Sequence, residues 1–381
     1  MRLLIVIFFA CFTLGSNASD VVKVGIYSGI KSLGAVVTPT KGEYFVIHNT
    51  DTLFIAEDES LEVRASHSQI RLTLRGQNYL FERKVVFQIN GWDCEFNLKP
   101  SGLKPRTYYD NLIIYARNNQ LVYVNEVDLE KYVAGVVESE AGAYHTKEYY
   151  KVQSVISRTY ALAHLQRHQK EGFHVCDKVH CQVMYGKVSY NDDILFAAYE
   201  TQGQVLVDDS IELITAAFHS NCGGHTVNAE TVWSKPLPYL VGVQDTFCLV
   251  MSQSHWEKDI PIGQWRDFLE KNHIELPKDS TGKTLAWFPS AKTEFYGKDS
   301  SVLRMVDVRN HFNLRSAWFA VEELEDHVHL TGRGFGHGVG LCQEGAIRMA
   351  REGIPYPDIL HHYYQGVHLI DMHLIPFFRE E

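Results

Sequence analysis

The feature that most constrains the fold is a single change in the spacing of apolar residues near position 125. Before it, short segments alternate apolar and polar residues or are rich in β-branched and aromatic side chains, with Gly, Asn, Asp or Ser between them. The expected strands include 21–27, 42–47, 70–74, 112–115 and 121–124, of which the last two form a hairpin. Residues 19–124 are therefore predicted to form a β-rich region.

After this point the apolar spacing becomes helical. Residues 128–137 place their apolar side chains on one helical face, a second helix is expected over 147–168, and a third over 343–352. The charged stretch 253–307 reads as an insertion or lid. Because single cores usually stop growing at ~250–300 residues, a chain of 381 residues favours a second region, at 125–372. The strands before position 125 and the helices after it predict an α+β protein.

The first 18 residues have the pattern of a signal peptide. Arg2 precedes an apolar run from Leu3 to Leu14, and small residues follow at Ser16 and Ala18. The run is shorter than the ~20 apolar residues needed to span a bilayer. We therefore expect an exported protein that is periplasmic or faces the cell wall, with membrane contact only through the export signal.

The net charge of −10 and the lack of any Lys/Arg-rich run exclude nucleic acid as the main partner.

Six cysteines remain after the signal, and an oxidising compartment would allow disulfides among them. Cys176, His180 and Cys181 have the spacing of half a zinc site, which His164, His168 or His174 would complete. A disulfide between the two cysteines is the alternative.

Two carboxylates stand at the end of the first helix. Glu138 and Glu140 are two residues apart and point to different sides of a helix, but Gly142 ends the helix and lets Glu140 project outward. Its apolar neighbours would partly desolvate it, which raises the pKa of the carboxyl and suits a general acid. The alternative is a pair of solvated surface carboxylates.

Two small-residue turns complete the candidate site. Five glycines alternate with other residues over 332–340 and surround His337, so the backbone can approach a ligand or a neighbouring chain closely. Ser220 lies in a second turn, 219–225. No nucleophile elbow pattern surrounds this serine, so we expect the turn to line the site and not to supply a nucleophile. The alternative for 332–340 is a tight structural turn with a packed histidine.

Taken together, these segments resemble the SpoIID/LytB family. The runs that carry the resemblance are 132–140, 153–161, 176–186, 220–224 and 332–346, in family order, and the similarity covers about 125–369. The resemblance implies a catalytic cleft between two lobes and a lytic transglycosylase that cuts peptidoglycan glycan strands, preferentially those stripped of stem peptides. It also implies that Glu140 is the acid and base and that Cys176, His180, Cys181 and an upstream histidine, taken as His168, hold zinc.

One carboxyl is sufficient for such a reaction. Ordinary glycosidases need two carboxylates, because one of them activates water or acts as a nucleophile. In a lytic transglycosylase the primary hydroxyl of the muramic sugar attacks the anomeric carbon and closes an anhydro ring.

For substrate binding we expect Arg158, Tyr160 and Arg333, with Ser220 and His337 beside them, since a guanidinium meets a lactyl carboxylate bidentately. Internal salt bridges are the alternative for the arginines.

Two other functions remain open on sequence alone. Some proteins that resemble this family enhance a wall amidase, so the chain would then hold glycan and a partner without cutting. A zinc hydrolase of wall peptides is the third class. It is disfavoured because thiolate-rich sites without a carboxylate ligand are more often structural.

Overall fold

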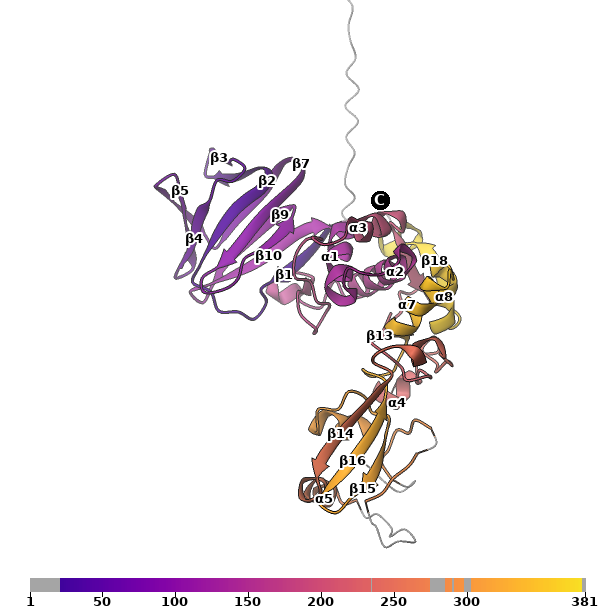
Figure 1. Ribbon diagram of the computed structural model, residues 1–381. Coiled ribbons are helices and arrows are strands. Elements are labelled where there is room, and N and C mark those ends of the chain that lie inside the picture. Colours follow the sequence, from indigo (N-terminus) through magenta and orange to yellow (C-terminus); the bar gives the residue numbers. More distant parts are fainter. Residues whose placement is uncertain (1–20, 234, 275–284, 290, 298–302, 379–381) are drawn as a thin grey trace, which may run out of the picture.

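The computed structural model describes residues 21–233, 235–274, 285–289, 291–297 and 303–378 (Figure 1). The predicted signal peptide, 1–18, lies outside the described residues. Within them the protein combines a large β-sheet with helices, which confirms the predicted α+β class. None of the described helices has the length and apolar character that a membrane span requires.

The N-terminal part is a mostly antiparallel sheet with strand order β11-β1-β10-β9-β7-β2-β4-β5-β6. Its strands are β1 (Val21–Ile26), β2 (Gly34–His48), β3 (Asp51–Ile55), β4 (Leu61–Ser66), β5 (Gln69–Leu74), β6 (Gln77–Glu82), β7 (Lys84–Pro100), β8 (Arg106–Tyr109), β9 (Asn111–Arg117), β10 (Gln120–Asp128) and β11 (Val175–Cys176). The predicted hairpin is confirmed as β9 and β10. Asn118 and Asn119 both have positive φ, as a two-residue hairpin turn that matches the strand twist requires.

The sheet continues directly into the helical part. β10 crosses the predicted boundary at 124, and Asp128 at its end caps helix α1 (Leu129–Ala141) by accepting hydrogen bonds from two first-turn N–H groups. Helix α2 (Lys147–Ala163) ends five residues before the predicted 168. At its end, the His164 ring bonds the Tyr160 carbonyl at 2.7 Å and the chain turns into η2 (Gln169–Glu171).

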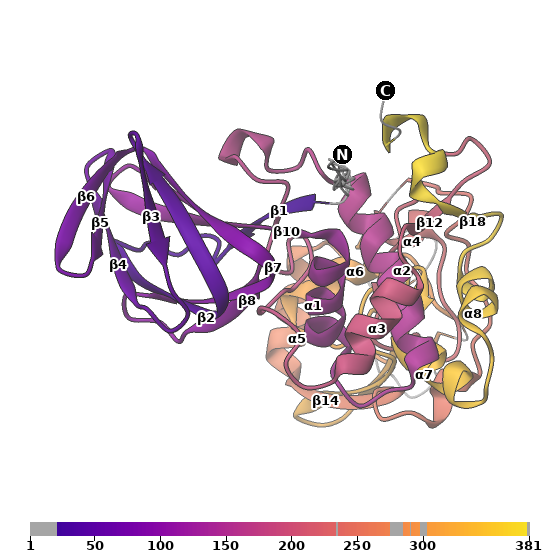
Figure 2. The same ribbon diagram turned by 90° about the horizontal axis from the view of Figure 1, so that it is seen from above.

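The remaining elements complete the helical part. They are α3 (Asp192–Glu200), β12 (Gln204–Val207), β13 (Phe218–His219), α4 (Ala229–Trp233), η3 (Phe247–Val250), β17 (Leu341–Cys342), α7 (Gln343–Arg351), α8 (Tyr356–Tyr363), β18 (His368–Asp371), η4 (Met372–Leu374) and η5 (Pro376–Phe378). Of these, α3, β12, α7 and α8 contact α2. β12 pairs with β18, and β13 pairs with β17. One apolar core runs from the sheet through these helices, so the two predicted regions share their interior. Figure 2 shows the β-rich body beside the helices.

The predicted insertion folds around a core of its own. β14 (His255–Pro261), β16 (His327–Arg333) and β15 (Phe319–Glu323) form a three-stranded sheet in that order. α5 (Ile262–Lys271) and α6 (Met305–His311) cover it, and Trp265 is fully buried at its centre. This core includes Leu330, so the unit extends beyond the expected 307. It projects from the helical part on the side of α4 (Figure 1). We call it the inserted subdomain.

Candidate functional site

Glu140 is held at the C-terminal end of α1, where Gly142 ends the helix with φ of 78°. Its Oε1 atom accepts a hydrogen bond of 2.8 Å from the Val183 N–H, and its Oε2 has no hydrogen-bond partner among the described residues. Burial raises the pKa of the Glu140 carboxyl above its ordinary value of 4.5, and the Val183 N–H opposes this only in part. The side chain is half-buried, so one oxygen is fixed while the other remains available to a ligand.

The two residues before Glu140 bind the same loop. Glu138 accepts hydrogen bonds from the N–H groups of Ser189 and Tyr190, and the Ser139 hydroxyl accepts one from the Tyr185 N–H. The end of α1 therefore anchors the loop 183–190 at four backbone positions. Glu138, which sequence reasoning grouped with Glu140 as a possible surface carboxylate, serves as an anchor of this loop.

The raised pKa of Glu140 has a measurable effect on stability. Well below pH 4.5 this carboxyl is protonated in both the folded and the unfolded chain, but at neutral pH only the unfolded chain ionises it without a desolvation cost. This group therefore lowers the free energy of unfolding as the pH rises through the folded-state pKa. Since glutamine does not titrate, we expect Glu140→Gln to gain stability relative to the wild type between pH 4 and pH 7, measured by urea unfolding. An equal difference in the free energy of unfolding between the two proteins at pH 4 and at pH 7 would contradict the raised pKa of Glu140.

The predicted zinc ligands lie together. One donor atom each from His168, Cys176, His180 and Cys181 lies within 4.8 Å of the other three. The Cys181 Sγ is 3.4 Å from the His168 Nε2 and 3.7 Å from the His180 Nδ1, and both thiols are free. We call this set the Cys/His cluster. His174, the other candidate for the upstream ligand, instead accepts a hydrogen bond from the Lys23 N–H.

The surroundings of the Cys/His cluster fit a divalent metal. The His168 Nδ1 bonds the Glu171 carboxylate at 2.6 Å, which directs the Nε2 lone pair toward the cysteines. Two imidazoles and two thiols form a donor set that is typical of tetrahedral zinc. The geometry therefore supports His168, and not His174, as the fourth ligand.

An open groove is lined by the residue that bonds Glu140 and by one member of this cluster; Glu140 itself is not among its lining residues. It is lined by Tyr27, Ile30, Arg106, Asp177, Lys178, Val179, His180, Val183 and Tyr185. Val183 is the residue that binds Glu140, and His180 belongs to the Cys/His cluster. We call this the Val183 groove. The guanidinium of Arg106 lies in it, 3.0 Å from Asp177 and 4.5 and 5.2 Å from the ring centres of Tyr27 and Tyr185.

Three tyrosines near the end of α1 are exposed. Tyr144 is 90% exposed, Tyr185 60% and Tyr190 80%, although tyrosine usually buries much of its ring. Tyr185 and Tyr190 belong to the loop that α1 anchors, and Tyr144 follows α1 by three residues. Three exposed rings thus belong to segments next to the end of α1, which sequence reasoning missed because their exposure depends on the tertiary fold.

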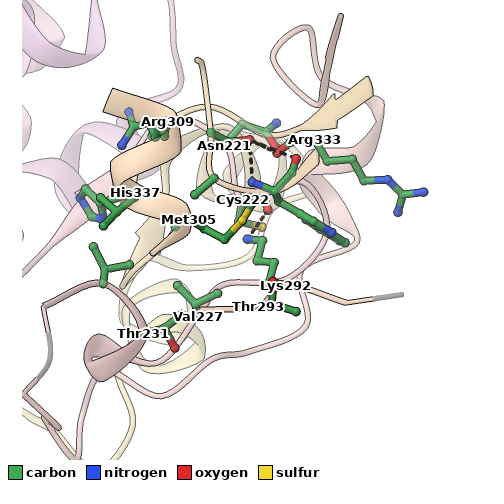
Figure 3. A pocket seen from close by; sticks show the side chains of 17 residues that line it. Asn221, Cys222, Val227, Thr231, Lys292, Thr293, Met305, Arg309, Arg333 and His337 are labelled. Atoms are coloured by element: carbon green, nitrogen blue, oxygen red, sulfur yellow. Dashed lines mark hydrogen bonds between the residues drawn. The ribbon is translucent and has the colours of Figure 1, made fainter. Parts of the chain in front are cut away.

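The glycine-rich turn borders a different pocket. Arg333 and His337 line it together with Cys222, Lys292, Arg309 and Trp318, between the turn at 221–227 and the inserted subdomain. In Figure 3, Arg309 and His337 lie on one side of the pocket and Arg333 on the other. Burial lowers the pKa of His337 to about 4, so its ring is neutral at pH 7, and its Nδ1 accepts a hydrogen bond from the Val339 N–H.

A glycine is required where this turn meets the turn at 221–227. Asn221 and Phe335 exchange backbone hydrogen bonds of 3.0 and 2.8 Å. Gly334, between Arg333 and Phe335, has φ of 79°, and a Cβ there would lie 2.6 Å from the Asn221 carbonyl oxygen. Of the two approaches predicted for the glycines, to a ligand or to neighbouring chain, the structure shows the second, toward another turn of the protein.

The predicted substrate-binding residues do not meet at one place. Tyr160 accepts a hydrogen bond from Arg167 near the Cys/His cluster, and Ser220 is half-buried, with its carbonyl accepting from the Glu344 N–H. Arg333 and His337 line the pocket at the inserted subdomain. Among the described residues, no hydrogen bond or ion pair joins Glu140 to the turn at 332–340.

The prediction that Arg158 binds substrate is wrong in this structure. Arg158 has no exposed surface, and its guanidinium forms a bidentate ion pair with Glu130, which is also buried. It also donates to the carbonyl oxygens of Gln204 and Ala198. All three of its guanidinium nitrogens thus donate hydrogen bonds, which join α1, α2, α3 and β12. The alternative of an internal salt bridge is the correct one.

The chain matches a family model described as "Stage II sporulation protein" (SpoIID) over residues 117–207. It is 32% identical to the stage II sporulation protein D of Bacillus subtilis, over 67% of this chain and 78% of that protein. It is 30% identical to an uncharacterized protein of Brachyspira hyodysenteriae over 77% of both chains. A third relative, the amidase enhancer of Bacillus subtilis, is 29% identical over 62% of this chain and 40% of its own length.

Proposed function

Because the chain belongs to the stage II sporulation protein D family and so has a cell-wall related role, we propose that it is an exported lytic transglycosylase of peptidoglycan glycan strands. Glu140 is its general acid and base in this proposal. The observation that carries it is the half-buried Glu140 carboxyl, which has a raised pKa and one oxygen fixed by Val183, a residue that lines the Val183 groove.

The neighbouring carboxylates support a mechanism with a single carboxyl. Glu138 is bound by the N–H groups of Ser189 and Tyr190, and Asp177 by those of Tyr27 and Ser28 and by Arg106. Both are thus committed as hydrogen-bond acceptors within the fold. A hydrolase with two carboxylates needs a second free carboxylate to activate water or attack the sugar. Neither Glu138 nor Asp177 is free to serve Glu140 as that second carboxylate.

In the proposed reaction, protons move only between Glu140 and the substrate. Protonated Glu140 donates its proton to the glycosidic oxygen as the bond from that oxygen to the anomeric carbon breaks. The primary hydroxyl of the muramic sugar then bonds the anomeric carbon, and its proton passes to the Glu140 carboxylate. No water is consumed, and the product carries an anhydro-muramic end.

The three exposed tyrosines support a polymeric sugar as the substrate. Sugar rings present apolar C–H faces that pack on exposed aromatic rings, and Tyr144, Tyr185 and Tyr190 belong to segments next to the end of α1. Arg106 lines the Val183 groove, whereas Arg158 is buried, and the Arg106 guanidinium can meet the lactyl carboxylate of muramic acid bidentately. We therefore assign that role to Arg106.

Zinc, when bound by His168, Cys176, His180 and Cys181, would supply a structural cross-link. Two ligands, His180 and Cys181, immediately precede the segment whose Val183 N–H bonds Glu140. The cluster would thus fix the position of the hydrogen-bond donor that Glu140 uses. A thiolate-rich, four-ligand site is closed to substrate and so has no direct part in the chemistry.

We expect His168→Ala to reduce zinc retention strongly, because it removes one of four ligands. His174→Ala is the matched control, since His174 lies outside the cluster and bonds the Lys23 backbone. Zinc per chain is measured by mass spectrometry of the metal during stepwise chelation. Equal retention by the two variants, or loss only in His174→Ala, would refute this ligand assignment.

The proposed activity is tested on purified full-length protein with two substrates, peptide-free glycan and intact peptidoglycan. We expect mass spectrometry to detect anhydro-muramic ends, with more cleavage of the peptide-free glycan. Ordinary reducing ends would identify a hydrolase, and no cleavage of either substrate would overturn the proposed activity.

The amidase enhancer among the relatives supports one alternative, a non-catalytic protein that holds glycan and stimulates a cell-wall amidase. The two functions differ in how they depend on Glu140. An enhancer would keep glycan binding and amidase stimulation in Glu140→Gln and would never produce anhydro ends. A transglycosylase would lose its cleavage products in the same variant.

A further inference from the structure

A second group of metal-ligating side chains lies in the interior, away from the Cys/His cluster. Cys222, Asp245, Cys248 and Cys342 each contribute one donor atom, and these four atoms lie within 4.8 Å of one another. Cys222 is 1% exposed and the other three are fully buried. They come from the turn after β13, the residues at η3, and the junction of β17 with α7.

From these residues we infer a second, structural metal site that binds a zinc ion through three thiolates and one carboxylate. The Cys222 Sγ is 3.4 Å from the Cys248 Sγ and 3.3 Å from the Asp245 Oδ2. In tetrahedral zinc with Zn–S of ~2.3 Å, neighbouring sulfur ligands are about 3.8 Å apart. The cluster is thus close to the size that a bound ion requires. Soft thiolates with one oxygen ligand favour zinc over magnesium or calcium.

The charge balance of the interior supports a bound cation. Asp245 is a fully buried carboxylate that forms no ion pair with any described residue. Its oxygens accept hydrogen bonds from the Tyr363 hydroxyl and the Cys248 N–H. Lys292 instead donates to the carbonyl oxygens of Cys222 and His225. A buried carboxylate without a counter-ion is costly, and a divalent ion at this position would compensate it.

The sulfur atoms also have hydrogen-bond donors that favour thiolates. The Cys342 Sγ accepts hydrogen bonds from the Cys222 N–H at 3.2 Å and from the Gly345 N–H at 3.4 Å. The second contact makes Cys342 the N-cap of α7, where the helix dipole favours negative charge. Such contacts from outside the ligand set orient ligands in protein metal sites.

The consequence for the molecule is a cross-link between three distant parts of the chain. Cys222 also lines the pocket that contains Arg333 and His337 (Figure 3). Because all four ligands are internal and buried, no position is open for substrate. The ion would therefore stabilise this pocket wall without taking part in chemistry.

The test uses the full chain carrying Cys176→Ala and Cys181→Ala, which removes two ligands of the Cys/His cluster. On this background we expect the purified protein to retain about one zinc ion per chain, as a single four-ligand site predicts, by metal mass spectrometry. Adding Cys248→Ala is expected to remove that ion. Adding Cys94→Ala, a buried thiol outside both clusters, is the matched control and should leave it in place.

X-ray absorption at the zinc edge identifies the zinc ligands directly and does not depend on whether Cys248→Ala folds. On the double-variant background we expect three sulfur atoms at ~2.3 Å and one oxygen at ~2.0–2.2 Å. Two results would overturn the site: no zinc on that background, or a Cys222–Cys248 disulfide in unreduced peptides. Because the readout is metal content, it is independent of whether the protein cuts glycan.

Discussion

Glu140→Gln is expected to lower the rate of glycan cleavage by about 10²–10⁴-fold, the usual contribution of a general acid–base group. The amide keeps an oxygen for the Val183 N–H but has no proton to give to the glycosidic oxygen. Binding of peptide-free glycan should persist, because the Val183 groove and the exposed tyrosines are unchanged. Rates are measured by release of soluble fragments, and binding by co-sedimentation with glycan.

Glu138→Gln is the matched control, on the same helix and two residues earlier. Its carboxylate anchors the N–H groups of Ser189 and Tyr190, and an amide oxygen preserves part of this contact. We expect a loss of less than ~10-fold, below the range of an acid–base group. If Glu138→Gln abolished cleavage while Glu140→Gln did not, the assignment of the general acid would be wrong.

The largest expected effect on stability belongs to Arg158→Met. The change leaves the Glu130 carboxylate buried and unpaired and removes the donors to the carbonyl oxygens of Gln204 and Ala198. Breaking a buried pair in this way costs about 3–5 kcal/mol. For a chain of this length, with an unfolding entropy of about 2.1 cal/mol/K per residue, this corresponds to a decrease of roughly 4–7 °C in the thermal midpoint, which circular dichroism measures directly.

Two further variants separate this structural role from substrate binding. Adding Glu130→Leu to Arg158→Met removes the stranded charge and should recover part of the lost stability. Arg333→Met alters an exposed side chain and should change the free energy of unfolding by no more than ~0.5 kcal/mol. If Arg158→Met kept a normal thermal midpoint but lost glycan binding, the prediction that Arg158 binds substrate would be correct after all.

Local patterns were sufficient to predict the elements and part of the site. The helical spacing after Asp128 predicted α1, and the polar turn at Asn118 and Asn119 predicted the β9–β10 hairpin. Glu140 was placed correctly at a helix end because Gly142 is a local signal. Cys176, His180 and Cys181 are close in sequence, so their proximity also follows from spacing.

The rest depends on contacts between distant segments. Cys222, Cys248 and Cys342 are spread over 120 positions, and nothing in their local sequence indicates that they meet. Arg158 has the same apolar helical neighbours whether it faces a cleft or the core, and its burial is decided by Glu130 and by carbonyl groups from α3 and β12. Arg106 was missed because only the fold brings its strand to the Val183 groove.

The most direct test of the central claim is cleavage of peptide-free glycan in water enriched in oxygen-18. If Glu140 passes its proton to the leaving oxygen and the muramic hydroxyl closes the ring, water is not a reactant. The new ends should then contain no heavy oxygen and should be anhydro-muramic by mass spectrometry. Incorporation of one oxygen-18 atom into each new end would show that water had attacked the sugar and would contradict the account.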